Sequence, residues 1–135
     1  MPRKIVEKPY NNGQWTQSRY NSFVKSALRK ASIKWPPKYQ VLKESQVGKK
    51  INKRSGRLAM HHECASCKNH FPSSVCSVDH IVPIIDPELG FISWDDTITR
   101  MFCEASGLQV LCKPCHDEKT NIEKGIANAR RKANK

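Results

Sequence analysis

Apolar residues recur along the chain at two spacings, and each spacing predicts a type of element. After Thr16, a suitable N-cap residue, apolar side chains repeat at intervals of three and four residues, as on one face of a helix. They are Tyr20, Phe23, Val24, Ala27, Leu28 and Ala31. We therefore expect an amphipathic helix whose apolar stripe packs into the core. A shorter helix is predicted after Trp35, because Pro36 and Pro37 suit a first helical turn, and it ends near Gly48.

Short strands and further helices are predicted in the second half of the chain. β-Branched and other apolar residues indicate strands at 57–64, 75–84 and 107–112. Helical spacing predicts helices at 93–102, with Ser93 as N-cap, and at 116–133, where acidic residues come first and basic residues last. Residues 48–57 combine glycine, serine and basic residues and are interpreted as an exposed loop or linker. The whole pattern predicts an α+β fold.

The net charge of the chain indicates the kind of partner that it binds. Lysine and arginine number 24 against 12 aspartates and glutamates, so the formal charge is +12 over 135 residues. A polyanion such as nucleic acid is the partner expected of so basic a chain. The length suits one domain with a small appendage. The sequence contains no long apolar run, signal peptide or lipidation motif, so we expect a soluble, cytoplasmic protein that does not bind membranes.

Four of the six cysteines form two CxxC pairs separated by 44 residues. The pairs are Cys64 with Cys67 and Cys112 with Cys115. Two such turns supply the four thiolates that zinc prefers, at about 2.3 Å per bond, so we predict a structural Zn²⁺ site. Disulfides and a redox CxxC are the alternatives. The remaining Cys76 and Cys103 are interpreted as reduced, buried small hydrophobes.

The long insertion between the CxxC pairs holds the segment VDHIVPI, and GLQVLCKPCHDEKT contains the second pair. With CASC, these segments resemble the HNH endonuclease family over about residues 58–124. The resemblance implies a ββα-metal finger (His-Me finger), framed here by a four-cysteine zinc site and preceded by an N-terminal helical extension. We therefore predict a flexible N-terminus at 1–14, a basic helical extension and linker at 15–57, and a nuclease domain at 58–135. The segment WTQSRYNSFVKSALRKA also resembles the start of small phage-type HNH proteins, which would place the protein in the host cytoplasm.

The resemblance implies roles for three residues. His80 would be the general base, Asp79 and His116 would bind one catalytic divalent ion such as Mg²⁺ or Mn²⁺, and cleavage of DNA would leave 5′-phosphate ends. The side-chain chemistry supports these roles, since carboxylate oxygen suits a hard cation and imidazole accepts protons near neutral pH. The alternatives are a surface polar pair at Asp79 and His80, and a fourth zinc ligand or helix cap at His116. The asparagine that the family commonly has before LQ is replaced by Gly107, so Gln109, Ser106 or backbone contacts would have to tie the loop.

Several basic residues are candidates for contacting DNA phosphates, with a solvated surface as the alternative. They are Lys49, Lys50, Lys53, Arg54, Arg57 and Lys119. His61, His62 and His70 match no motif and are interpreted as surface or strand residues. One active centre favours nicking by a monomer, with a dimer needed for double-strand breaks. The rival functions are a non-catalytic zinc-finger DNA-binding protein and a redox or metal-storage protein.

Overall fold

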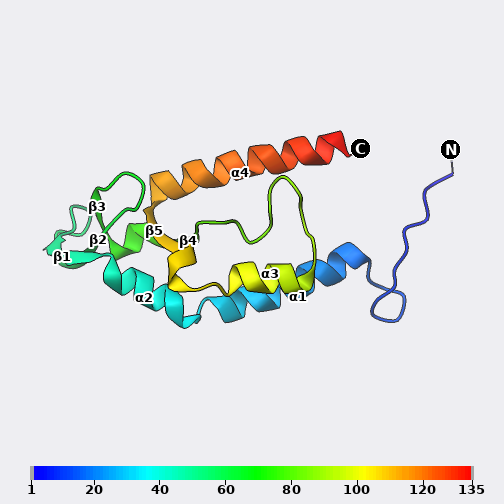
Figure 1. Ribbon diagram of the computed structural model, residues 1–135, viewed down its shortest axis with the longest axis horizontal. Helices are drawn as coiled ribbons and strands as arrows, with labels where there is room; N and C mark the ends of the chain where they lie inside the picture. The colour runs from blue at the N-terminus through cyan, green and yellow to red at the C-terminus, as the bar shows by residue number, and fades with distance from the viewer. Residues whose placement is uncertain (1, 135) are drawn as a thin grey trace. The chain divides into compact units, whose positions relative to one another are not determined.

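The computed structural model describes residues 2–134. In this range the chain forms four α-helices and two small antiparallel sheets, which confirms the α+β prediction (Figure 1). The chain divides into two compact units between Lys34 and Trp35. The boundaries predicted at residues 14 and 57 remain predictions.

The first unit contains helix α1 (Gln17–Ser32), preceded by a turn that pairs Tyr10 with Trp15. The hydroxyl of Thr16 accepts a hydrogen bond from Arg19 N at 3.1 Å, which confirms the predicted cap. The prediction that the apolar stripe of α1 packs into a core is wrong. Its residues are exposed or half-buried, and Phe23 is 62% exposed. This unit has one helix, and the preceding turn covers the stripe only in part, through the stacking of Tyr10 on Tyr20.

The second unit begins with helix α2 (Pro36–Glu44), which ends four residues before the predicted Gly48. Val41 of α2 is buried against Leu108 and Val110, and these three residues form a small core cluster. The indole nitrogen of Trp35 donates to Cys103 O at 2.6 Å. Helix α2 therefore belongs to the packing of the second unit, because one face of it covers the strand that contains Leu108 and Val110.

A three-stranded antiparallel sheet follows, in the order β1 (Gln46–Ile51), β2 (Leu58–Glu63) and β3 (His70–Pro72). The predicted strand at 57–64 is confirmed as β2. The prediction of a loop over 48–57 is wrong in its first part, since residues 48–51 belong to β1. Strand pairing uses backbone groups, so an edge strand tolerates lysines that argue against a strand by composition. Strand β3 has three residues, too few to give a sequence pattern.

The second sheet pairs β4 (Cys76–His80) with β5 (Leu108–Cys112), antiparallel, with Asp79 opposite Gln109. Helix α3 (Trp94–Met101) lies between the two strands in the sequence and is capped by Ser93 as predicted. A 3₁₀ turn precedes each strand, at Ser73–Val75 before β4 and at Ala105–Gly107 before β5. Helix α4 (Lys113–Ala133) follows β5 directly (Figure 1). It begins three residues before the predicted start, because Pro114 is accepted in the first turn. Among residues 2–134, no helix has the length and apolar character needed to cross a membrane.

Candidate metal centre and active site

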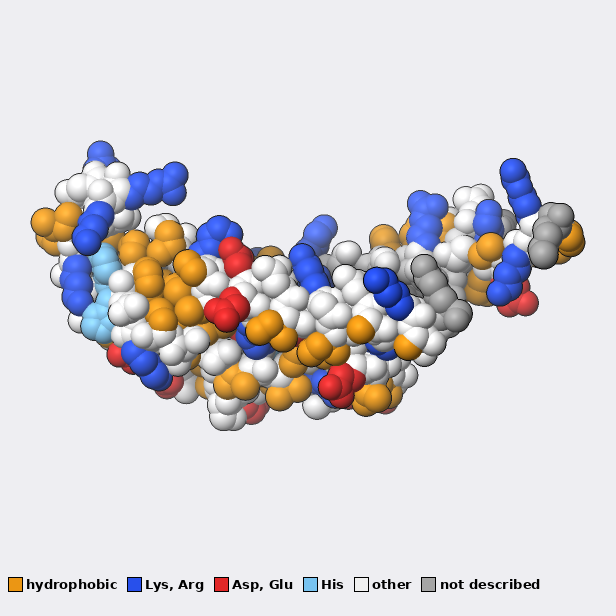
Figure 2. All heavy atoms as spheres, turned by 90° about the horizontal axis from the view of Figure 1, so that it is seen from above, with side chains coloured by type: hydrophobic (Ala, Val, Ile, Leu, Met, Phe, Trp, Pro, Cys, Tyr) orange, Lys and Arg blue, Asp and Glu red, His pale blue; other side chains and the backbone are white. Residues whose placement is uncertain are grey.

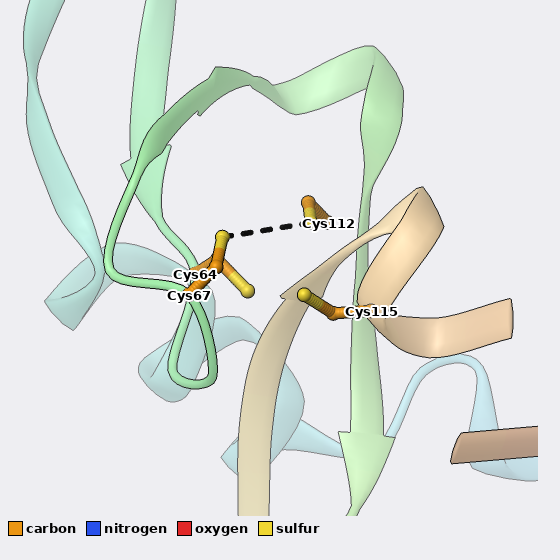
Figure 3. A group of neighbouring side chains, drawn as sticks. All are labelled: Cys64, Cys67, Cys112 and Cys115. Carbon is orange, nitrogen blue, oxygen red and sulfur yellow. Dashed lines mark hydrogen bonds between the residues drawn. The ribbon is translucent and has the colours of Figure 1, made fainter. Parts of the chain in front are cut away.

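Four cysteines from distant parts of the second unit meet at one point. Cys64 follows β2, Cys67 lies in the next turn, Cys112 ends β5, and Cys115 lies in the first turn of α4. Their sulfur atoms all lie within 4.8 Å of one another, and Figure 3 shows the side chains pointing toward a common centre. The four-cysteine site is thus close enough to hold a metal ion, as the CxxC spacing predicts. Cys76 and Cys103 are free and half-buried.

Backbone hydrogen bonds form the first CxxC turn. Lys68 N donates to Cys64 O at 3.0 Å, and Cys64 N donates to Asn69 O at 3.0 Å. Lys68 has a φ of 64°, in the left-handed region, which lets the chain reverse after Cys67. Ala65 N donates to Val110 O at 2.8 Å, which ties the turn to β5. Both sheets therefore converge on the four-cysteine site.

The geometry and the acidity of the thiols suit a soft, tetrahedral metal ion. Bonds of about 2.3 Å to zinc place tetrahedral sulfurs about 3.8 Å apart, and Cys67 Sγ lies 3.9 Å from Cys112 Sγ. Burial raises the pKa of Cys64, but hydrogen bonds from nearby backbone N–H groups outweigh it and lower the pKa to about 6. Burial raises the pKa of Cys112 to about 12. A metal ion would release the remaining protons, because thiolate is the form that binds metal.

Asp79 lies on β4 and faces α4. Its side chain is 12% exposed, and its Oδ1 atom lies 4.0 Å from His116 Nε2. Its other oxygen, Oδ2, accepts hydrogen bonds from Gln109 Nε2 at 3.0 Å and from Lys119 Nζ at 3.2 Å. The two donors occupy one carboxylate oxygen and leave the other directed at His116. The structure therefore brings together Asp79 and His116, the two residues expected to share a divalent ion.

Lys119 links Asp79 to two further groups. Its ammonium donates to His80 O at 3.0 Å and to Glu123 Oε1 at 2.6 Å. Burial lowers the pKa of Lys119, but the hydrogen bonds and charges of Glu123 and Asp79 outweigh burial and raise it above the usual 10.5. The sequence pattern suggested phosphate contact or solvation for Lys119 and assigned no role to Glu123. Their i,i+4 spacing indicates an ion pair, but the link to Asp79 depends on packing between β4 and α4.

The imidazole of His80 lies on the other face of β4. Its Nε2 atom lies 2.8 Å from Met101 O, at the end of α3. A carbonyl oxygen only accepts hydrogen bonds, so Nε2 carries the hydrogen and Nδ1 is the basic nitrogen of the neutral ring. Adjacent strand residues point to opposite faces, which explains why His80 contacts α3 while Asp79 contacts α4. The strand ends at His80, four residues before the end predicted for the strand at 75–84.

Gly107 occupies a crowded position before β5. A Cβ atom there would lie 3.0 Å from Cys103 Sγ, so a larger residue would require Cys103 to move. Ile81 N donates to Gly107 O at 3.0 Å, and Gly107 N donates to Glu104 O at 2.9 Å. Backbone contacts therefore join the end of β4 to the start of β5, while the side chain of Gln109 binds Asp79.

The remaining sequence candidates lie in the three-stranded sheet. Lys49, Lys50, Lys53, Arg54 and Arg57 are all exposed on β1 or on the turn after it. The interpretation of His61 and His62 as strand residues is confirmed, but they are buried, at 7% and 1% exposure. His62 Nε2 lies 2.7 Å from Ser73 Oγ and its Nδ1 lies 2.8 Å from Ser45 Oγ. His62 therefore fastens α2 and the 3₁₀ turn at Ser73 to β2.

Comparison of the chain with known protein families, with curated proteins and with solved structures gave no match.

Proposed function

We propose that the protein is a metal-dependent endonuclease of the HNH type that hydrolyses phosphodiester bonds in DNA. The observation that supports this proposal most directly is the approach of Asp79 Oδ1, on β4, to His116 Nε2, on the helix that follows the paired strand β5, at 4.0 Å. Ligand bonds of about 2.0–2.1 Å to Mg²⁺ allow two ligand atoms to lie between about 2.9 and 4.2 Å apart. The two residues present therefore fit one shared divalent ion.

Each residue of the site has a proposed role. Asp79 and His116 would hold the ion, which when bound would supply positive charge to the phosphoryl oxygens and the departing 3′ oxygen. Gln109 and Lys119 hold Asp79 Oδ2, so that Oδ1 stays directed at the ion site. Met101 O fixes the His80 ring through Nε2, and Nδ1 would accept a proton from the attacking water. Because the His80 ring and Asp79 lie on opposite faces of β4, this role requires the scissile phosphate to lie at the end of the strand, within reach of both faces. Attack on phosphorus with departure of the 3′ oxygen leaves a 5′ phosphate on one end and a 3′ hydroxyl on the other.

A zinc ion in the four-cysteine site is the second part of the proposal. Four thiolates form a closed tetrahedral donor set, which is typical of structural zinc and leaves no position for a substrate. Cys112 precedes His116 by four residues, and Cys76 at the other end of β4 pairs with Cys112. Zinc at this site would thus fix the start of α4 against β5 and β4. That is the geometry on which the pairing of Asp79 with His116 depends.

DNA is the proposed partner because the chain has a formal charge of +12. A single Asp79 and His116 site in each chain suits nicking by a monomer, and two copies would be needed to cut both strands.

The experiment is a nicking assay on supercoiled plasmid with Mg²⁺ or Mn²⁺, using the full zinc-loaded chain. We expect wild-type protein to convert the plasmid to the open circle and both His80→Ala and Asp79→Ala to lose activity. His70→Ala is the matched control, because His70 is an exposed histidine of the same unit. Binding without cleavage by the wild-type protein would instead support a non-catalytic DNA-binding protein.

A further inference from the structure

Strands β1 and β2 with the turn between them form a hairpin, residues 46–63, whose only acidic residue is Glu63 at its base. From Gln46 to His62 the chain has five basic residues and no acidic one. The basic residues are Lys49, Lys50, Lys53, Arg54 and Arg57. Figure 2 shows Lys and Arg side chains gathered at the left of the view, where Figure 1 draws this hairpin. We call residues 46–63 the basic hairpin.

The turn of the basic hairpin is held by its own hydrogen bonds. Asn52 N donates to Arg57 O at 2.8 Å, and Gly56 N donates to Asn52 O at 2.7 Å. The side chain of Asn52 also accepts from Arg54 N at 3.0 Å. Three basic side chains are therefore presented from a defined turn, which lowers the conformational entropy lost when they bind a partner.

An apolar pair lies next to this turn. Ile51 and Leu58 are opposite each other in the last pair of the strand ladder and are 64% and 69% exposed. Residues directly opposite in antiparallel strands point to the same face, so the two side chains form one exposed aliphatic surface. Single exposed aliphatic residues are ordinary in proteins. Two adjacent ones at the base of a cationic turn indicate contact with a partner that is both anionic and apolar in part.

The basic hairpin is attached directly to the four-cysteine site. Strand β2 runs into Cys64, and Ala65 N donates to Val110 O of β5 at 2.8 Å. Glu63 N donates to Ser45 O at 3.0 Å, which fastens the base of the hairpin to the end of α2. The position of the hairpin relative to β5, and so to Gln109 and Asp79, is set by these contacts.

We propose that the basic hairpin inserts into the major groove of duplex DNA. Lys53, Arg54 and Arg57 would contact phosphates on the groove edges, while Ile51 and Leu58 would pack against apolar base edges such as thymine methyl groups. A two-stranded antiparallel ribbon fits the major groove, which is about 12 Å wide. This inference deepens the proposed function by naming the part of the chain that holds duplex DNA, and it requires binding but no cleavage.

The charge contribution is tested by binding of a fluorescein-labelled duplex, followed by anisotropy across a series of salt concentrations. The buffer contains no added divalent ion, so that binding is measured without cleavage. The variant Lys53→Gln/Arg54→Gln/Arg57→Gln should bind on the order of 100-fold more weakly at 0.1 M salt, and its log–log salt slope should fall by about 3. The matched control is Lys124→Gln/Arg131→Gln/Lys132→Gln, three exposed residues of α4 with the same total charge change. Equal weakening in both variants would overturn the proposal.

The groove contact is tested by Ile51→Ser/Leu58→Ser in the same assay. We expect affinity to fall about tenfold with an unchanged salt slope, since apolar contact is lost and phosphate contact is kept. Methyl green, a major-groove ligand, should compete with the wild-type protein, and distamycin, a minor-groove ligand, should not. Unchanged affinity of the serine variant, competition by distamycin alone, or equal affinity for single-stranded DNA would each contradict insertion into the major groove. Circular dichroism and zinc content establish that each variant is folded. Loss of nicking in an otherwise normal DNA binder would count against the proposed reaction and leave this inference standing.

Discussion

Replacing Lys119 with methionine tests whether the contacts of its ammonium group stabilise the fold. The ammonium of Lys119 lies 3.2 Å from Asp79 Oδ2 and 2.6 Å from Glu123 Oε1. Lys119 and Asp79 side chains are 25% and 12% exposed, so solvent screens their attraction only in part. Methionine keeps most of the apolar stem and removes the charge, so the variant isolates the ammonium contacts.

The magnitude follows from these contacts. A hydrogen bond between charged groups contributes about 1.5–3 kcal/mol, and a partly exposed i,i+4 pair such as Lys119 with Glu123 adds about 0.3–0.5 kcal/mol. Gln109 remains bonded to Asp79, so the carboxylate loses one of its two donors. We therefore expect Lys119→Met to lower the free energy of unfolding by at least about 2 kcal/mol, which is a large part of the stability of a typical domain.

The assay is urea denaturation of zinc-loaded protein at neutral pH, followed by circular dichroism. Lys124→Met is the matched control, because Lys124 is an exposed lysine of the same helix. It should change the free energy of unfolding by no more than about 0.5 kcal/mol. Equal destabilisation by the two variants, or none by Lys119→Met, would show that the ammonium contacts of Lys119 do not stabilise the fold.

Three further predictions concern the loop before β5, the half-buried thiol of Cys103 and the four-cysteine site. Gly107→Ala should destabilise the fold by about 1 kcal/mol, because the new Cβ would lie 3.0 Å from Cys103 Sγ. In a double-mutant cycle, Gly107→Ala should destabilise the fold less when Cys103 is also replaced by alanine. Additive effects of the two substitutions would contradict the clash. Burial raises the pKa of the Cys103 thiol above 9.0. The protonated thiol therefore contributes stability that is fully present below pH 9 and is lost as pH rises through the folded pKa. Iodoacetamide labelling of Cys103, measured by mass spectrometry, should be slow at pH 7.5 and accelerate above pH 9. Removing zinc with a strong chelator should abolish cooperative unfolding and make the four site thiols react fast, whereas a folded, unreactive metal-free chain would rule out a structural metal.

The sequence was sufficient to predict the elements whose signals are local. Thr16 and Ser93 cap helices as their residue types indicate, and both CxxC pairs have the spacing of a metal site. Strand β1 was missed because backbone pairing with β2 stabilises a segment whose side chains resemble a loop. The core assignment for the α1 stripe failed for a related reason, since periodicity identifies an apolar face without identifying what covers it.

The candidate site was predictable in its residues and only partly in its contacts. The motif identified Asp79, His80 and His116, but their orientations depend on packing. Asp79 contacts Gln109 because the register of β4 with β5 places them opposite each other, and it contacts Lys119 because α4 packs on β4. Neither the register nor the packing of α4 can be deduced from local spacing, because both depend on how the four-cysteine site brings distant segments together.

The most direct test of the proposed function is the plasmid nicking rate of wild-type protein beside that of His80→Ala, each zinc-loaded and supplied with Mg²⁺ or Mn²⁺. If His80 removes a proton from the attacking water, the variant should retain zinc stoichiometry and duplex affinity while its nicking rate falls by at least about 100-fold. Nicking by His80→Ala at the wild-type rate, or an absence of nicking by wild-type protein that binds the plasmid, would contradict the proposed endonuclease.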